Sequence, residues 1–211
     1  MMAALKLYET IDIWSEARRL LVSAKGTLGA YLVIMTLSET VVDRFPEIVP
    51  VGWAGSAIML FMSYWLTINM LYFGGLAPGG VQKGLFAFLG LTFLYAIVIG
   101  LGWVALVFPA FYFGIRFSAV LGYGMGETGD FRDAFGRSWN ATKGHFWEIA
   151  GALFVPLVLS VISFSIIGSW ADKSLQVPIG AAIASNFFAA ATGATLIAIG
   201  VGVYAAARTR V

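Results

Sequence analysis

The chain has 211 residues, of which 60% are apolar and only 11% are charged. Soluble domains carry about 25% charged residues, so this composition excludes a water-soluble enzyme and a disordered chain. The formal net charge of +2 also excludes a nucleic-acid-binding surface, which needs a strong excess of basic side chains. The sequence therefore predicts an all-α integral membrane protein, a polytopic bundle of about six transmembrane helices.

The first predicted element is an amphipathic helix within residues 1–25, ahead of a membrane domain that covers residues 26–211. Over residues 4–22 the helical period gathers apolar side chains on one face. This face consists of Tyr8, Ile11, Trp14, Ala17 and Leu21. We expect a cytoplasmic helix in the membrane interface, and two interpretations of its apolar face stay open. It packs on the cytoplasmic ends of the protein's own spans, or it docks a partner or anionic lipid.

Six apolar segments approach the roughly 20 residues that a spanning helix needs. They cover about 27–43, 51–75, 84–107, 109–126, 146–168 and 178–206. Residues 84–126 are almost free of charge, and one helix of this length would run about 65 Å, twice the hydrocarbon thickness. We therefore expect a break at Pro109, which lacks the N–H that a helix interior needs. The alternative is one kinked element that lies partly at the interface.

The distribution of basic residues predicts the orientation of these spans. With six spans and a cytoplasmic N-terminus, ten of the thirteen Lys and Arg residues fall on the cytoplasmic side, two fall outside, and Arg116 lies within a span. This bias agrees with the positive-inside rule. We expect both termini in the cytoplasm.

A short cytoplasmic elbow helix is predicted over residues 130–142, between the fourth and fifth spans. Asp130 is a favourable N-cap residue, and Gly144 is a suitable terminator just before the fifth span. The expected role of this helix is a fixed structural connection between the two spans.

The segment around the elbow contains a series of residues at defined spacings. It consists of a Pro-x-x-Tyr turn, an Arg, an acidic residue, an Ala-x-x-x-Ser pair, a Thr-x-Gly step and an aromatic residue. In this chain these positions are Pro109, Tyr112, Arg116, Glu127, Ala134, Ser138, Thr142, Gly144 and Trp147. The pattern resembles a broad family of poorly characterised bacterial multi-span membrane proteins, which includes the membrane domain found ahead of some glycerophosphodiester phosphodiesterases. Ala110 stands where that family usually has Gly.

The resemblance implies a multi-span architecture in a bacterial cytoplasmic (inner) membrane. It also implies that phosphodiesterase chemistry belongs to a separate soluble domain, in which clustered His, Glu and Asp side chains surround a metal. This chain has one His and no Cys. We therefore expect no catalytic residue, no metal site and no cofactor, and we do not expect the chain to be an enzyme.

Arg116 is predicted to lie about 10 Å inside the fourth span at 1.5 Å per residue. An Arg at this depth is costly unless it faces the bundle interior and has a partner. We expect it to pair with Glu39, near the outer end of the first span, and so to join the first and fourth spans. At the cytoplasmic end of the fourth span, Glu127 is expected to pair with Arg137 or Arg132.

The last span carries small side chains at four-residue spacing on two faces, which lets helix backbones approach closely. One face contains Ala181, Ser185, Ala189 and Gly193, and the other contains Ala190, Ala194, Ala198 and Gly202. These faces pack either within the chain or against a membrane-protein partner or a second copy. Gly122 and Gly126 give a weaker signal of the same kind in the fourth span.

The function predicted from these features is that of a non-enzymatic membrane protein, a scaffold or accessory subunit that packs against a larger membrane complex or organises lipid. Its partners would be membrane lipids and a membrane protein or a second copy, and not nucleic acid. The alternative is a transporter or channel-like protein for a small solute or lipid, with Arg116 near the path. A water-accessible polar cavity that reaches Arg116 favours transport, and a dry, filled bundle favours the scaffold.

Overall fold

The computed structural model describes residues 10–77, 83–105, 107–171 and 177–208. All regular structure in these residues is α-helical, as the composition predicts. The helices are α1 Thr10–Ser23, α2 Lys25–Arg44, α3 Val49–Phe73, α4 Leu85–Ala105, α5 Val107–Arg116, α6 Val120–Gly126, α7 Phe131–Ala141, α8 Phe146–Ala152, α9 Phe154–Ala171 and α10 Ile179–Arg208.

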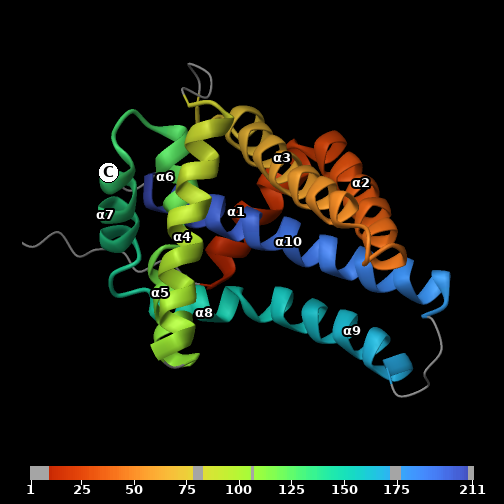
Figure 1. Cartoon of the computed structure of the whole chain (residues 1–211). Coiled ribbons are helices and arrows are strands. Elements are labelled where there is room, and N and C mark those ends of the chain that lie inside the picture. Colours follow the sequence, from red (N-terminus) through yellow and green to blue (C-terminus); the bar gives the residue numbers. More distant parts are fainter. Residues whose placement is uncertain (1–9, 78–82, 106, 172–176, 209–211) are drawn as a thin grey trace, which may run out of the picture.

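The longest helix, α10, forms the centre of the molecule. With 30 residues it is about 45 Å long at 1.5 Å per residue. It packs against α9 on one side and against α2 and α3 on the other, and these four helices run side by side in Figure 1. Helix α4 runs roughly perpendicular to α10 in Figure 1, near the C-terminal end of α10, and α5, α6 and α7 lie at this same end of the molecule.

Helix α1 buries its apolar face inside the molecule. Ile13, Ala17 and Leu20 are fully buried, and α1 contacts α10, α8 and α3. A bend of 85° separates α1 from α2, so α1 runs nearly perpendicular to the span that follows it. The absence of a side chain at Gly202 of α10 permits the close approach, because a Cβ there would lie 3.3 Å from the backbone of Ile13 and Ala17.

The buried face of α1 is rotated from the predicted one. Ala17 belongs to both faces, whereas Trp14 and Leu21 are half-buried at the edge of the observed face. Tyr8 and the side chain of Ile11 lie outside the described residues. Of the two interpretations of the apolar face, the structure supports packing on the protein's own helices.

Four predicted spans correspond to single helices of the structure. The segments 27–43, 51–75, 84–107 and 178–206 correspond to α2, α3, α4 and α10. The segment 146–168 is divided into α8 and α9 at Leu153, because Pro156 lacks the N–H that would bond back to the Ala152 carbonyl.

The number of membrane crossings stays a prediction. By length and composition, three apolar helical segments among the described residues can cross a membrane, namely Val49–Phe73, Phe146–Trp170 and Ile179–Arg208. The bent pair of α1 and α2 would be a fourth.

The single continuous helix predicted over residues 109–126 is wrong. Helix α5 ends at Arg116 and α6 begins at Val120; at about 15 Å and 10 Å, neither is long enough to cross a bilayer. The break lets the backbone approach α10, since a Cβ on Gly200 would lie only 2.6 Å from the Ser118 carbonyl oxygen. Pro109 lies in the first turn of α5, where its missing N–H costs nothing.

Candidate functional site: the elbow cluster

The predicted elbow helix is present as α7, and its two ends have the expected signals. Asp130 is the N-cap residue, and its own N–H donates to Asp133 Oδ2 at 3.3 Å. After the helix, Gly144 has φ +86°, a left-handed conformation that glycine adopts without steric cost. The chain can therefore turn directly from α7 into α8.

The break after α5 leaves the carbonyl oxygen of Arg116 without its helical partner. Two side chains replace that partner, one from α7 and one from the C-cap residue of α7. Ser138 Oγ and Thr142 Oγ1 each lie 3.0 Å from this oxygen, and both residues are fully buried. A carbonyl oxygen has two lone pairs and can accept from both hydroxyl groups. The single proton of Thr142 is shared between this oxygen and the Ser138 carbonyl oxygen, which lies 2.9 Å from Thr142 Oγ1. These contacts fix α7 against the end of α5.

The guanidinium group of Arg116 lies on aromatic rings of α5 and α7. Its Nε donates to Tyr112 Oη at 3.1 Å, and Nη1 is 3.5 Å from the Trp139 carbonyl oxygen. The central carbon is 4.4 Å from the centroid of the Trp139 ring and 5.4 Å from that of Tyr112, within the range of cation–π attraction. We call Tyr112, Arg116, Ser138, Trp139 and Thr142 the elbow cluster.

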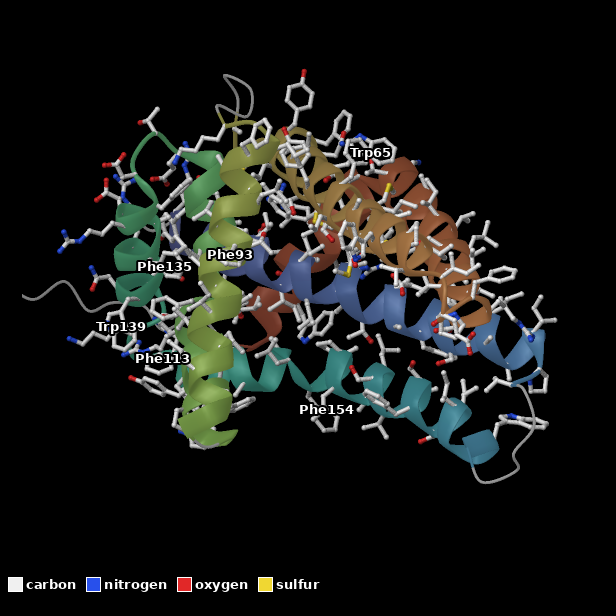
Figure 2. All side chains as sticks on the ribbon, viewed as in Figure 1. Trp65, Phe93, Phe113, Phe135, Trp139 and Phe154 are labelled. Atoms are coloured by element: carbon white, nitrogen blue, oxygen red, sulfur yellow. The ribbon has the colours of Figure 1, made fainter. Side chains whose placement is uncertain are left out.

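Aromatic rings continue outward from the elbow cluster. Tyr112 stacks on Phe146 of α8 with a centroid distance of 6.0 Å and meets Trp139 edge-on at 5.9 Å. The ring centroid of Phe117 lies 5.7 Å from that of Trp139 and 5.1 Å from that of Phe135. In Figure 2, Phe135 and Trp139 lie where α7 faces α4 and α5. The cluster thus joins α5, α7 and α8.

The remaining positions of the sequence pattern lie around the cluster. Glu127 forms an ion pair with Arg137, the first of its two expected partners, and this pair links the end of α6 to α7. Ala134 is buried, whereas Trp147 is 79% exposed and does not belong to the cluster. Of the predicted site residues, the structure therefore brings Tyr112, Arg116, Ser138 and Thr142 together.

The expected pair of Arg116 with Glu39 is not formed among the described residues. Glu39 lies on α2 one turn before Asp43, whose carboxylate accepts a 2.8 Å hydrogen bond from Asn186 Nδ2 of α10. Arg116, in contrast, precedes the break that approaches Gly200 of α10. Asn186 and Gly200 are separated by about 21 Å along the helix, so the two charges lie toward opposite ends of the molecule. The prediction failed because it assumed an unbroken fourth span.

One small-residue face of α10 is buried within the chain. Its members Ala190, Ala194, Ala198 and Gly202 are all buried. The weaker signal in the fourth span is also intramolecular, because the ring of Tyr204 packs on Gly122 and Gly126 of α6.

The other small-residue face of α10 is partly covered. Ser185 is buried and Gly193 lies against Tyr31, whose hydroxyl oxygen would be 2.7 Å from an added Cβ. Ala181 is half-buried and Ala189 is exposed. This face therefore retains room for a neighbour outside the chain.

Polar side chains within the long helices join one helix to another. Ser163 of α9 and Ser185 of α10 approach with a 2.9 Å Oγ–Oγ distance, and each hydroxyl is 3.1 Å from the carbonyl oxygen of the other residue. Asn186 of α10 also donates to Thr40 Oγ1 of α2 at 3.2 Å. These hydrogen bonds fasten α9 and α2 to the two sides of α10.

Sequence reasoning misses two residues of this region, Trp139 and Phe146. The spacing of Tyr112 and Arg116 is a signal for the Tyr112 ring, because side chains four positions apart on a helix are neighbours. No comparable signal identifies Trp139 or Phe146, because they come from α7 and α8.

Comparison with known families and proteins supports the resemblance read from the elbow. A family model described as the membrane domain of glycerophosphoryl diester phosphodiesterase matches residues 87–205, from α4 through nearly all of α10 and including the whole elbow cluster. Comparison with curated proteins and with solved structures found no match. The chain belongs to the family of the membrane domain of glycerophosphoryl diester phosphodiesterase.

Proposed function

We propose that this chain is a non-enzymatic scaffold or accessory subunit of a bacterial cytoplasmic membrane, with both termini in the cytoplasm. It would pack against a larger membrane complex, or against a second copy, and help to organise the surrounding lipid. The proposal concerns the role of the chain itself and assigns no phosphodiesterase activity to it.

The observation that carries the proposal is the use of polar side chains as contacts between helices. Ser163 and Ser185 bond across α9 and α10, Asn186 bonds to α2, and the elbow hydroxyls bond to the end of α5. In a membrane such contacts hold helices together, whereas a transport route exposes ionisable or polar groups to a water-filled path. Arg116 does not line the hollow at α7, between Phe117 and Trp139, or the groove between α5, α9 and α10.

The surface offers a face for a partner. On α10, Ala189 and Ala181 keep part of the small-residue face uncovered, and on α9 large apolar side chains such as Phe164 and Val161 are 78% and 57% exposed. Small residues beside large apolar ones allow a neighbouring helix to pack closely.

The test is extraction of the protein in native lipid nanodiscs, followed by mass spectrometry of everything that stays bound. We expect a stoichiometric membrane-protein partner or a second copy, which Ala189→Trp should displace and Gly26→Trp, at an open position of α2, should not. A monomer that retains only an enriched solute would contradict the scaffold and support the transporter alternative.

The non-enzymatic part of the proposal makes a separate prediction. The family resemblance places phosphodiester hydrolysis in a separate soluble domain with His and carboxylate side chains around a metal. The described residues bring no three His, Cys, Asp or Glu side chains together in a group that could hold a metal ion. The purified chain, assayed with glycerophosphocholine and added divalent metal, should release no glycerol phosphate above the protein-free blank. Release that scales with protein and disappears in His145→Ala would contradict it.

A further inference from the structure

Arg116 carries a positive charge that no carboxylate neutralises in the part of the chain that the structure describes. Neither of the ion pairs there includes it. Its Nε and Nη1 atoms have acceptors on Tyr112 and Trp139, but Nη2 has no acceptor among the described residues. The side chain is only half-buried, so these free N–H groups can reach a ligand. Planar guanidinium N–H groups match the oxygen atoms of a phosphate.

An apolar groove of about 290 Å³ runs between α5, α9 and α10. Its walls include Phe111, Leu153, Leu157 and Leu196. The hydroxyl groups of Ser160 and Thr192, which also line it, donate to carbonyl oxygens of their own helices at 3.0 Å and 2.9 Å. The groove therefore presents an apolar surface to whatever occupies it.

Aromatic rings connect the groove to Arg116. Phe111 of the groove meets Phe146 edge-on with a centroid distance of 6.1 Å. Phe146 stacks on Tyr112 at 6.0 Å, and Tyr112 accepts the hydrogen bond from Arg116. A single amphipathic molecule can therefore reach both the cation and the groove.

The length of the groove fits one lipid chain. Its α8–α9 wall extends from Ala150 to Ser160, about 15 Å at 1.5 Å per residue. The hydrocarbon core of a bilayer is about 30 Å thick, so each leaflet contributes about 15 Å of acyl chain. Phe154, at the middle of this wall, is labelled in Figure 2 and is 63% exposed.

The elbow also has a marker of the headgroup level. Trp147 is 79% exposed and packs edge-on against Phe146 with a centroid distance of 5.0 Å. Exposed Trp side chains are typical of the membrane–water interface. Arg116, which shares the Phe146–Tyr112 stack, therefore lies near the level at which phospholipid phosphates lie.

We propose that the elbow cluster binds one anionic phospholipid, with its phosphate on Arg116 and one acyl chain in the groove between α5, α9 and α10. An anionic lipid fits better than a zwitterionic one, because the unpaired guanidinium is neutralised by a phosphodiester that brings no cation of its own. This site goes beyond the scaffold role and needs no protein partner.

The test is binding of phosphatidylglycerol to the detergent-purified full chain, measured by native mass spectrometry over a lipid titration. We expect one tightly retained phosphatidylglycerol per chain and weaker retention of phosphatidylcholine. Because a charge-assisted hydrogen bond is lost, Arg116→Gln should weaken phosphatidylglycerol binding by about tenfold or more. The matched control is Arg132→Gln, which removes the same charge from an exposed position of α7 and should leave binding within about twofold.

A second variant tests whether the groove holds the acyl chain. Leu196→Trp, at a residue that is 45% exposed and lines the groove, should fill the groove and weaken phosphatidylglycerol binding while the chain stays folded. Inorganic phosphate, added in excess, should not displace the lipid, because it lacks the acyl chain.

Three results would overturn the proposal. Arg116→Gln and Arg132→Gln could weaken binding equally, which indicates general surface attraction. Leu196→Trp could bind phosphatidylglycerol as the natural chain does, which leaves the groove without a role. Displacement by inorganic phosphate would indicate a free-anion site. If Arg116→Gln fails to fold, Leu196→Trp and the phosphate competition still decide the question, and none of these readouts depends on a protein partner.

Discussion

At the scale of single residues, the carbonyl oxygen of Arg116 determines how the elbow is held. Helix α5 ends at this residue, and its carbonyl oxygen lies 3.0 Å from the hydroxyl oxygens of Ser138 and Thr142. Both hydroxyl groups are buried, so water does not replace them when they are removed. An unpaired buried acceptor costs more than the net stabilisation of an ordinary hydrogen bond.

The double variant Ser138→Ala/Thr142→Val should therefore destabilise the protein by about 1–3 kcal/mol. Each single variant should cost less, because the other hydroxyl still reaches the oxygen. The free energy of unfolding in mixed detergent micelles measures both effects. The control is Ser165→Ala, an exposed residue of α9 whose hydroxyl donates only within its own helix. A double variant no less stable than this control would contradict the capping role.

Gly144 supplies a second prediction at this scale. Its φ of +86° is unfavourable for a residue with a Cβ, so Gly144→Ala should destabilise the elbow by about 1 kcal/mol. Gly136→Ala, at a helical position of α7 with nothing within 4 Å of the added Cβ, should instead stabilise by up to about 1 kcal/mol. Thermal unfolding of the two variants should shift in opposite directions, and shifts of the same sign would contradict the argument.

At the scale of helices, the sequence predicts elements better than it predicts their interruptions. Hydropathy and length place α2, α3, α4 and α10 within a few residues, and Asp130 and Gly144 place α7. These features are local, because apolar length and capping residues act within one segment.

The break between α5 and α6 has no such local signal. It depends on partners that are distant in sequence, namely the hydroxyl groups of α7 and the close approach of Ser118 to Gly200 of α10. The same error displaced Arg116 from the predicted depth and led to the pair with Glu39. The rings around Arg116 were missed for the same reason, since Trp139 and Phe146 come from other helices.

The packing of α6 on α10 gives a prediction at the helix scale. A Cβ on Gly122 would lie 2.4 Å from Tyr204 Cβ, and Tyr204 is fully buried. Gly122→Ala should therefore lower the free energy of unfolding by about 1–3 kcal/mol through overpacking. Gly168→Ala, on α9 with no neighbour within 4 Å, is the matched control. Equal stability of the two variants would contradict the packing described for Tyr204.

At the scale of the whole molecule, the proposed roles depend on which ends of the helices share a membrane face. Helix α1, the elbow helix α7 and the end of α10 lie together, and the charge distribution predicts that this end is cytoplasmic. The loop after α2 lies at the other end, where Arg44 donates to the Val177 carbonyl oxygen at 3.0 Å before α10 begins. Both the scaffold and the lipid site require this separation.

Single-cysteine labelling with a membrane-impermeant maleimide tests this arrangement most directly, because the chain has no native cysteine. Asn140→Cys on the exposed side of α7 and Glu47→Cys in the loop after α2 are both exposed positions. We expect Glu47→Cys to be labelled in intact spheroplasts and Asn140→Cys to be labelled only in inverted vesicles. Labelling of both positions from the same side would contradict it.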